Sequence, residues 1–323
     1  MARALLKRVN WSRLRMMAGR QALINIAILA VVVGLFGTQL DSLSASFKAL
    51  SQANPAGALL ALVVVVLTFP AAALTYQTLA GKPVRLLPTI QIQVASGFIN
   101  RLLPIGIGSL GLYVAYFRKQ GLTGAAAAAV VVTNNILGIV GNILMVIVVL
   151  LLQPQYVDNL RTPKFTSTLC MALGVVVVVG ALLVVISRTH WKDRIFELLH
   201  KLGAALKTSF KPDKRFLLGL LYNMLLTSLN TAALTCSVLA VGGSMGWPVA
   251  LLVLSAGMLV GSAVPTPGGI GGVEAGMLAG MLVFGATPAT GLAAVLLYRG
   301  LTYWLPIIPG VLMFRHLEKR HFL

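Results

Sequence analysis

The 323-residue chain is 58% hydrophobic and only 10% charged, with a mean hydropathy of +0.91. A soluble domain carries about 25% charged residues, so the composition excludes a soluble globular protein and indicates a polytopic membrane protein. The formal net charge is +19. The Lys and Arg residues lie in short segments that flank apolar runs, without the interleaved aromatic residues that single-stranded nucleic acid requires, so nucleic acid is not an expected partner.

Six apolar segments are long enough for a helix to cross a bilayer core, which takes about 20 residues. They are 21–40, 56–80, 123–152, 166–187, 216–241 and 287–314. The first follows a basic arm and is longer than the signal-peptide core of about 7–15 residues. It is therefore predicted to be a retained anchor.

Two further apolar regions, 88–117 and 248–284, are interrupted in the middle by Pro and Gly, in LLPIGIGSLG (102–111) and VPTPGGIGG (264–272). Each arm is too short for a comfortable crossing. Broken helices at membrane depth are tolerated only where they are packed in protein or line a wet cavity. The sequence therefore predicts an all-α polytopic membrane protein with about six full spans and two re-entrant broken-helix hairpins.

The two broken regions resemble each other, because PIGIGSL (104–110) aligns with PGGIGGV (267–273). Each hairpin has a full span on either side, and three crossings separate the hairpins, so they would enter from opposite faces. This predicts an inverted-topology repeat within one membrane domain (1–323), with repeat 1 at about 56–152 and repeat 2 at about 216–314. Transporters with such repeats bind substrate near the midplane, between the repeats.

The flanking charges predict the orientation, because cytoplasmic loops carry an excess of Lys and Arg. With the N-terminus inside, nearly all of the 26 Lys and Arg fall in inner segments, and only Lys48, Arg161 and Lys164 fall in outer ones. Both termini are thus expected on the cytoplasmic side of a bacterial cytoplasmic (inner) membrane. Segment 188–212 has apolar residues at helical spacing with lysines between them, which indicates either an amphipathic helix on the inner surface or an ordinary basic linker.

Three charged residues fall within membrane segments: Arg101 before the first hairpin tip, Glu274 after the second, and Arg299 in the last span. A charge at the bilayer centre costs at least about 2.5–3.5 kcal/mol, so these residues should have partners. One interpretation is a structural ion pair between Glu274 and either arginine. The other is that the surplus positive charge and the free N–H groups at the hairpin tips bind an anionic group such as a lipid phosphate.

Other polar and small residues complete the candidate site. Asparagines in the spans would either line a polar cavity or join helices by hydrogen bonds; they are Asn100, Asn134, Asn135, Asn142, Asn223 and Asn230. The substrate-binding residues predicted beside the three charges are Asn100, Gly106, Gly108, Gly269, Gly271 and Tyr298. The predicted hinge residues at the tips are Pro104, Pro265 and Pro267.

Motifs for catalysis and cofactors are lacking. GIGSLG (106–111) matches the G-x-G-x-x-G pattern, but no strand precedes it and membrane spans surround it. The two cysteines, Cys170 and Cys236, lie in apolar spans and indicate neither a disulfide framework nor a metal site. No nucleophile, base and orienting group suggest a triad, so we expect no enzyme, no metal and no cofactor.

The C-terminal motif PTPGGIGGVEAG (265–276), followed by LLYRGLTYWLPIIPG (296–310), resembles that of the lysylphosphatidylglycerol synthetase transmembrane-region family. This family includes the flippase half of the multiple peptide resistance factor and small stand-alone members. The matching positions are Pro267, Gly269, Ile270, Gly271, Glu274, Tyr298, Arg299, Tyr303, Trp304 and Pro306. The first-repeat signature, an Asn before a Pro/Gly turn, is similar to Asn100–Gly111.

Two departures from the family pattern qualify what the resemblance implies. The full-length synthetases carry a soluble aminoacyl-transfer domain, whereas this chain ends at HLEKRHFL (316–323), so aminoacyl-lipid synthesis is not expected of it. Ser109, Leu110 and Gly111 stand where many relatives carry a charged residue, which argues against two symmetric binding sites.

Two main functions follow as hypotheses, and a small-solute porter or channel, which would need a water path wide enough for the solute, is a third. The first is a flippase-like transporter that moves the headgroup of an anionic phospholipid or a polyprenyl-type lipid between leaflets, with Arg101 and Arg299 holding the phosphate. The alternative is a non-transporting scaffold that binds a lipid or a lipid-modifying enzyme. The expected partner is an anionic membrane lipid, and a second copy of the chain or a lipid-biosynthetic enzyme are open alternatives.

Overall fold

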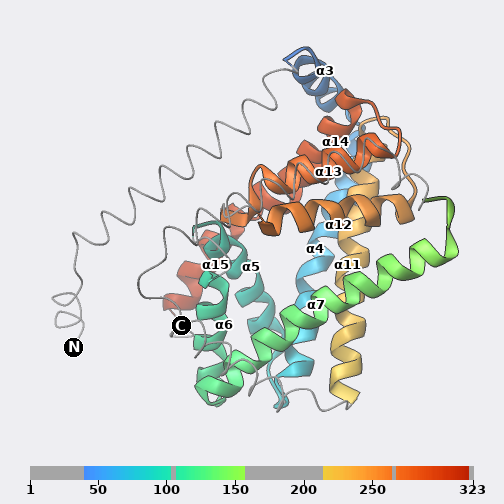
Figure 1. The fold of residues 1–323 in the computed structure, drawn as a ribbon. Coiled ribbons are helices and arrows are strands. Elements are labelled where there is room, and N and C mark those ends of the chain that lie inside the picture. The colour runs from blue at the N-terminus through green and yellow to red at the C-terminus, as the bar shows by residue number, and fades with distance from the viewer. Residues whose placement is uncertain (1–39, 103–106, 157–213, 264–266, 320–323) are drawn as a thin grey trace, which may run out of the picture. The chain divides into compact units, whose positions relative to one another are not determined.

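A computed structural model describes residues 40–102, 107–156, 214–263 and 267–319, and all regular structure in them is helical (Figure 1). The chain divides into two compact units, 1–44 and 45–323; every helix from α4 onward belongs to the second. Several sequence predictions fall outside the described residues: nearly all of span 21–40, span 166–187, the helix at 188–212, Pro104, Gly106, Pro265, and the side chains of Arg101 and Pro267.

Four helical segments among the described residues are long and apolar enough to cross a membrane, and they confirm four of the six predicted spans. They are α4 (Pro55–Leu79), α7 (Gly124–Leu152), α11 (Lys214–Ala240) and the stretch Pro288–Lys319. Their outward faces expose large apolar side chains such as Leu59, Ile139 and Leu221, as contact with lipid requires. Asn54 and Thr123 cap α4 and α7 by accepting backbone N–H groups of the first turn.

The last of these stretches differs from the uninterrupted span expected at 287–314. It consists of α14 (Pro288–Arg299), the π-helical turn η3 (Gly300–Trp304) and α15 (Ile307–Lys319). The N–H of Leu305 donates to the carbonyl of Gly300 at 2.8 Å, one residue further back than in an α-helix. The next residue, Pro306, has no N–H to donate to Thr302, so the regular ladder is already broken at this point.

The shorter helices fall on either side of the predicted Pro/Gly breaks. The first pair is α5 (Leu86–Leu102) and α6 (Ile107–Lys119). The second pair is α12 (Trp247–Ala263) and α13 (Gly272–Val283), with the short 3-10 turn η2 (Pro267–Gly269) between them. A further helix, α3 (Leu40–Ser51), precedes α4.

Helices α12 and α13 lie side by side and touch through glycines (Figure 1). A Cβ added at Gly276 would lie 2.9 Å from the carbonyl oxygen of Ala256 and 2.9 Å from the Cα of Gly257. Added to Gly257 or Gly261, it would lie 2.3 Å and 2.2 Å from side-chain atoms of Met277 and Val273. Residues four apart thus form a small-residue seam on each helix, which permits the close backbone approach common in membrane helix pairs. This spacing was visible in the sequence but was not among the predicted features.

Asparagine side chains join the long helices. Asn223 of α11 donates to Asn134 of α7 at 3.3 Å, and Asn142 of α7 donates to Ser255 of α12 at 3.0 Å. For these residues the structure favours interhelical hydrogen bonds over the lining of a polar cavity.

Candidate functional site

The second hairpin tip is built from glycines with positive φ. Gly268, Gly269 and Gly271 have φ values of +64°, +68° and +85°, a region where a side chain is strained. These angles turn the chain between α12 and α13 within a few residues. They also leave the carbonyl of Gly268 and the N–H of Gly271 available to the charged side chains beside them.

Glu274 lies in the first turn of α13, where a carboxylate is favoured by the helix dipole. Its Oε2 accepts the N–H of Gly271 at 2.8 Å, so the side chain folds back over the helix end. Its Oε1 accepts the Nε–H of Arg299 at 2.6 Å. The Arg299 and Glu274 side chains are only 10% and 17% exposed. Of the two arginines that the sequence offered as partners, the structure thus pairs Glu274 with Arg299.

Arg299 connects the last helical stretch to the tip of the second hairpin. Its Nη2 donates to the carbonyl of Gly268 at 3.2 Å, and the guanidinium carbon lies 4.4 Å from the centre of the Tyr303 ring. Two of its five N–H groups are therefore engaged, one by Glu274 and one by the carbonyl of Gly268. Nη1 donates no hydrogen bond to the residues that the structure describes.

Tyr303 packs against the tip so closely that only glycine fits at position 268. A Cβ added to Gly268 would lie 2.3 Å from Cε2 of Tyr303 and 3.0 Å from its hydroxyl oxygen. Tyr303 belongs to the family motif but was not among the predicted site residues. Its spacing of four from Arg299, which places both side chains on one face of a helical segment, was the available signal.

We expect Tyr303→Leu to lower the free energy of unfolding by about 0.5–2 kcal/mol, because it removes the aromatic face under a largely desolvated guanidinium. Tyr303→Phe keeps that face and should retain most of the stability. Unfolding of both variants in lipid bicelles measures the difference. An equal loss in both variants would contradict the role of the ring and assign the effect to the hydroxyl.

Other predicted residues occupy different positions around this pair. Tyr298 is buried, and its hydroxyl donates to Asn230 of α11 at 3.4 Å, a long hydrogen bond. Asn100, near the end of α5, accepts the N–H of Ser109 in the first turn of α6 at 3.1 Å, so it closes the first hairpin. Gly108 lies in α6. These contacts give Tyr298 and Asn100 roles in joining helices.

The first hairpin reaches the second tip through α5. This helix carries Arg101 in its last turn, and it contacts η2 as well as α15. At the α15 contact, a Cβ added to Gly310 would lie 2.8 Å from the Cβ of Phe98. The backbone of α5 therefore brings the first hairpin against the element that holds Gly268.

The site offers anion recognition more readily than bond chemistry. A guanidinium, a carboxylate and two backbone groups of a glycine turn, the Gly268 carbonyl and the Gly271 N–H, meet between apolar helices and bond one another. Arginine binds carboxylates and phosphates through parallel N–H donors, and a low-dielectric setting strengthens such bonds.

Comparison with known proteins places the chain in a family. No curated protein matches it. The model of the family described as "Lysylphosphatidylglycerol synthase TM region" matches residues 22–310, which is most of the chain and includes the Glu274–Arg299 site. The chain, an integral membrane protein with four candidate spans among its described residues, therefore belongs to the lysylphosphatidylglycerol synthase TM-region family.

Proposed function

We propose that the protein is a lipid transporter, which moves the headgroup of an anionic phospholipid or a polyprenyl-type lipid between leaflets. The observation that carries the proposal is Arg299. It is an arginine that is 8% exposed in an apolar helical bundle, and it keeps Nη1 unengaged by the described residues. A family whose name refers to a phospholipid supports the same class of ligand.

The helix contacts support an inverted-topology repeat as the framework of transport. Each proposed repeat has a long helix, two short helices and a long stretch: α4 to α7, then α11 to α15. The two first helices, α4 and α11, pack together. The last helix of repeat 1, α7, contacts α11 and α12, and the last stretch of repeat 2 contacts α4 and α5, so the contacts are reciprocal. Under this proposal the short pairs are re-entrant hairpins whose tips meet at the midplane.

The distribution of basic residues supports a cytoplasmic face at one end of the bundle. Lys82 follows the end of α4, Arg118 lies in the last turn of α6, and Arg215 lies at the start of α11. These three helix ends lie at the same end of the bundle (Figure 1). Positive charge gathers on the cytoplasmic side of membrane proteins. The proposal accordingly puts both termini on the cytoplasmic side of a bacterial inner membrane.

The proposed transport cycle uses the ion pair as a gate for the headgroup. At rest Glu274 holds the Nε–H of Arg299. An arriving phosphate would take over the guanidinium donors, and Glu274 would then swing away or accept a proton. Arg101, at the end of α5, would be the second ligand of the phosphate. The cycle has no bond-breaking step and uses no nucleotide, so transport would be downhill or coupled to an ion.

The scaffold function is favoured by a different feature of the same site. The Glu274–Arg299 pair bonds mainly to itself and to the adjacent turn, because Glu274 accepts from Gly271 and Arg299 while Arg299 also donates to Gly268. Such a network can hold the hairpin tip against the last helical stretch without taking any part in transport. Under this alternative the protein binds a lipid or a lipid-modifying enzyme without moving lipid.

Transbilayer movement of a fluorescent phosphatidylglycerol analogue in proteoliposomes tests the proposal. The wild type should move the analogue faster than protein-free vesicles do. Arg299→Lys should slow movement by about tenfold or more, because a lysine still balances Glu274 but lacks the planar fork that binds a phosphate through two donors.

The matched control is Lys48→Gln, which removes an exposed positive charge from α3, remote from the pair in sequence. It should transport as the wild type does. If well-folded Arg299→Lys also transports normally, Arg299 is structural. If the wild type moves neither phosphatidylglycerol nor a polyprenyl phosphate analogue, the scaffold function is favoured.

A further inference from the structure

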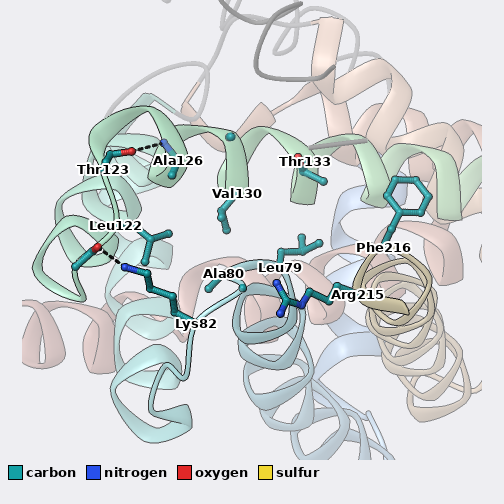
Figure 2. Close-up of a pocket in the computed structure, with 13 residues that line it drawn as sticks. Leu79, Ala80, Lys82, Leu122, Thr123, Ala126, Val130, Thr133, Arg215 and Phe216 are labelled. Carbon is teal, nitrogen blue, oxygen red and sulfur yellow. Dashed lines mark hydrogen bonds between the residues drawn. The ribbon is translucent and has the colours of Figure 1, made fainter. Parts of the chain in front are cut away.

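A second polar site lies at the basic end of the bundle, away from the Glu274–Arg299 pair. There a pocket of about 490 Å³ opens between the end of α4, the turn before α7 and the start of α11. Figure 2 shows Lys82 and Arg215 across this space from the first turns of α7. None of the described residues that line the pocket is acidic.

Both cations lie close to the backbone of the turns that border the pocket. Lys82 Nζ donates to the carbonyl of Gly121 at 2.8 Å, which uses one of its three N–H donors. Arg215 lies over Gly81, where a Cβ would be 2.8 Å from Nη1. Gly81 also has a φ of +67°, so both its conformation and this close approach favour glycine. The turn after α4 thus forms a cradle for the guanidinium.

The start of α7 adds partial positive charge to the same pocket. Thr123 caps this 29-residue helix, its Oγ1 accepting the N–H of Ala126 at 3.2 Å, and both residues line the pocket (Figure 2). The first N–H groups of a helix have no intrahelical acceptors, and the helix dipole favours an anion there.

Thr133, further along α7, is an independent sign that the pocket receives a polar ligand. It lines the pocket and is only 3% exposed, yet its Oγ1 has no hydrogen-bond partner among the described residues. A buried hydroxyl without a partner costs about 1–3 kcal/mol. A bound polar group, or the water that it brings, would relieve this cost.

We propose that this pocket binds the phosphate group of a ligand, with Lys82 and Arg215 as its charged donors. Leu79, Leu122 and Val130 give the pocket an apolar wall, which suits a phospholipid whose phosphate lies between the cations and whose acyl chains leave toward the bilayer. A soluble phosphate offers the same acceptor oxygens without the apolar part. The site goes beyond the proposed function, because binding here does not depend on lipid crossing the membrane.

Native mass spectrometry of the full chain in detergent micelles tests this site by titration with phosphatidylglycerol, phosphatidylcholine or inorganic phosphate. A lipid site predicts a tightly bound phosphatidylglycerol that millimolar inorganic phosphate does not displace. A site for soluble phosphate predicts that inorganic phosphate binds alone and competes with the lipid. In either case Lys82→Gln and Arg215→Gln should each weaken binding about tenfold, because each removes charge-assisted hydrogen bonds.

The matched control is Arg85→Gln, which neutralises an exposed arginine at the same end of the bundle but outside the pocket. It should bind as the wild type does. Equal weakening by Arg85→Gln would overturn the site in favour of diffuse attraction to a basic surface. Unchanged binding in Lys82→Gln and Arg215→Gln would overturn it outright.

A measurement on the wild type keeps the inference testable if the variants fold poorly. Acylation of Lys82 by an amine reagent should slow when phosphatidylglycerol, or inorganic phosphate if that is what binds, is added, whereas acylation of Lys119 should not change. Equal rates at Lys82 with and without ligand, at concentrations where mass spectrometry detects binding, would place the ligand elsewhere. Because transport is not measured, failure here would leave the function proposed for Arg299 intact.

Discussion

Glu274→Ala should lower the free energy of unfolding by about 3–5 kcal/mol, since removing one partner of a buried ion pair leaves the other charge uncompensated. In this variant Arg299 would keep only its bond to Gly268 and its contact with Tyr303. The N–H of Gly271 would also lose its acceptor at the start of α13. Equilibrium unfolding in bicelles measures the loss.

The double variant Glu274→Ala/Arg299→Met should be more stable than Glu274→Ala alone, because it also removes the buried positive charge. Glu318→Ala is the matched control, since Glu318 is exposed near the end of α15, and its effect should stay within about 0.5 kcal/mol. If the double variant were as unstable as the single one, the carboxylate would act mainly through Gly271 as a helix cap. If Glu274→Ala were neutral, the pair would contribute nothing to the fold.

The sequence predicted the helical framework well because membrane spans and their breaks have strong signals. A bilayer requires long apolar helices, and Pro and Gly interrupt them. The breaks expected at 102–111 and 264–272 correspond to the ends of α5 and α12 and the starts of α6 and α13. The π-turn after Arg299 was not predicted, since Pro306 alone does not determine which hydrogen bonds replace the one that it removes.

The sequence predicted which charged residues belong to the candidate site, but not which of them form the pair. A carboxylate among apolar residues needs a cation, so Glu274 and an arginine were expected to pair. The choice of Arg299 depends on how the hairpin tip meets the last helical stretch, and sequence spacing contains no information on that distance. The closeness of Lys82 and Arg215 could not be predicted for the same reason. In the sequence they indicate only which side of the membrane their segments face. Their shared pocket arises only when three helix ends come together.

Glycine spacing, by contrast, was present in the sequence and was overlooked. GMLVG (257–261) and GVEAGMLAG (272–280) both place glycines four residues apart. Glycine breaks helices at the tip, where φ is positive. Within α12 and α13 the same residue type permits contact between helices. The position in the helix decides which of these two roles applies.

Gly276→Ala should therefore destabilise the hairpin, by about 1–3 kcal/mol, as overpacking in a tight interface does. The added methyl would lie 2.9 Å from backbone atoms of Ala256 and Gly257, which cannot rotate away as a flexible side chain can. The two helices would have to separate. Because Glu274 lies only two residues earlier on α13, the separation would also shift the carboxylate from Arg299. Under the transport function proposed above, this shift should slow lipid movement in proteoliposomes.

A graded series distinguishes this clash from the general effect of an added methyl. At Gly280 the nearest atom to an added Cβ is the Cα of Val253 at 3.3 Å, and at Gly111 of α6 nothing lies within 4 Å. The loss of stability should thus be largest for Gly276→Ala and smaller for Gly280→Ala. Gly111→Ala should be neutral or stabilising by up to about 1 kcal/mol, since alanine favours a helix interior over glycine. An equal loss at all three positions would contradict close helix approach as the cause. The predicted order would mean that the α12–α13 seam positions the charge pair.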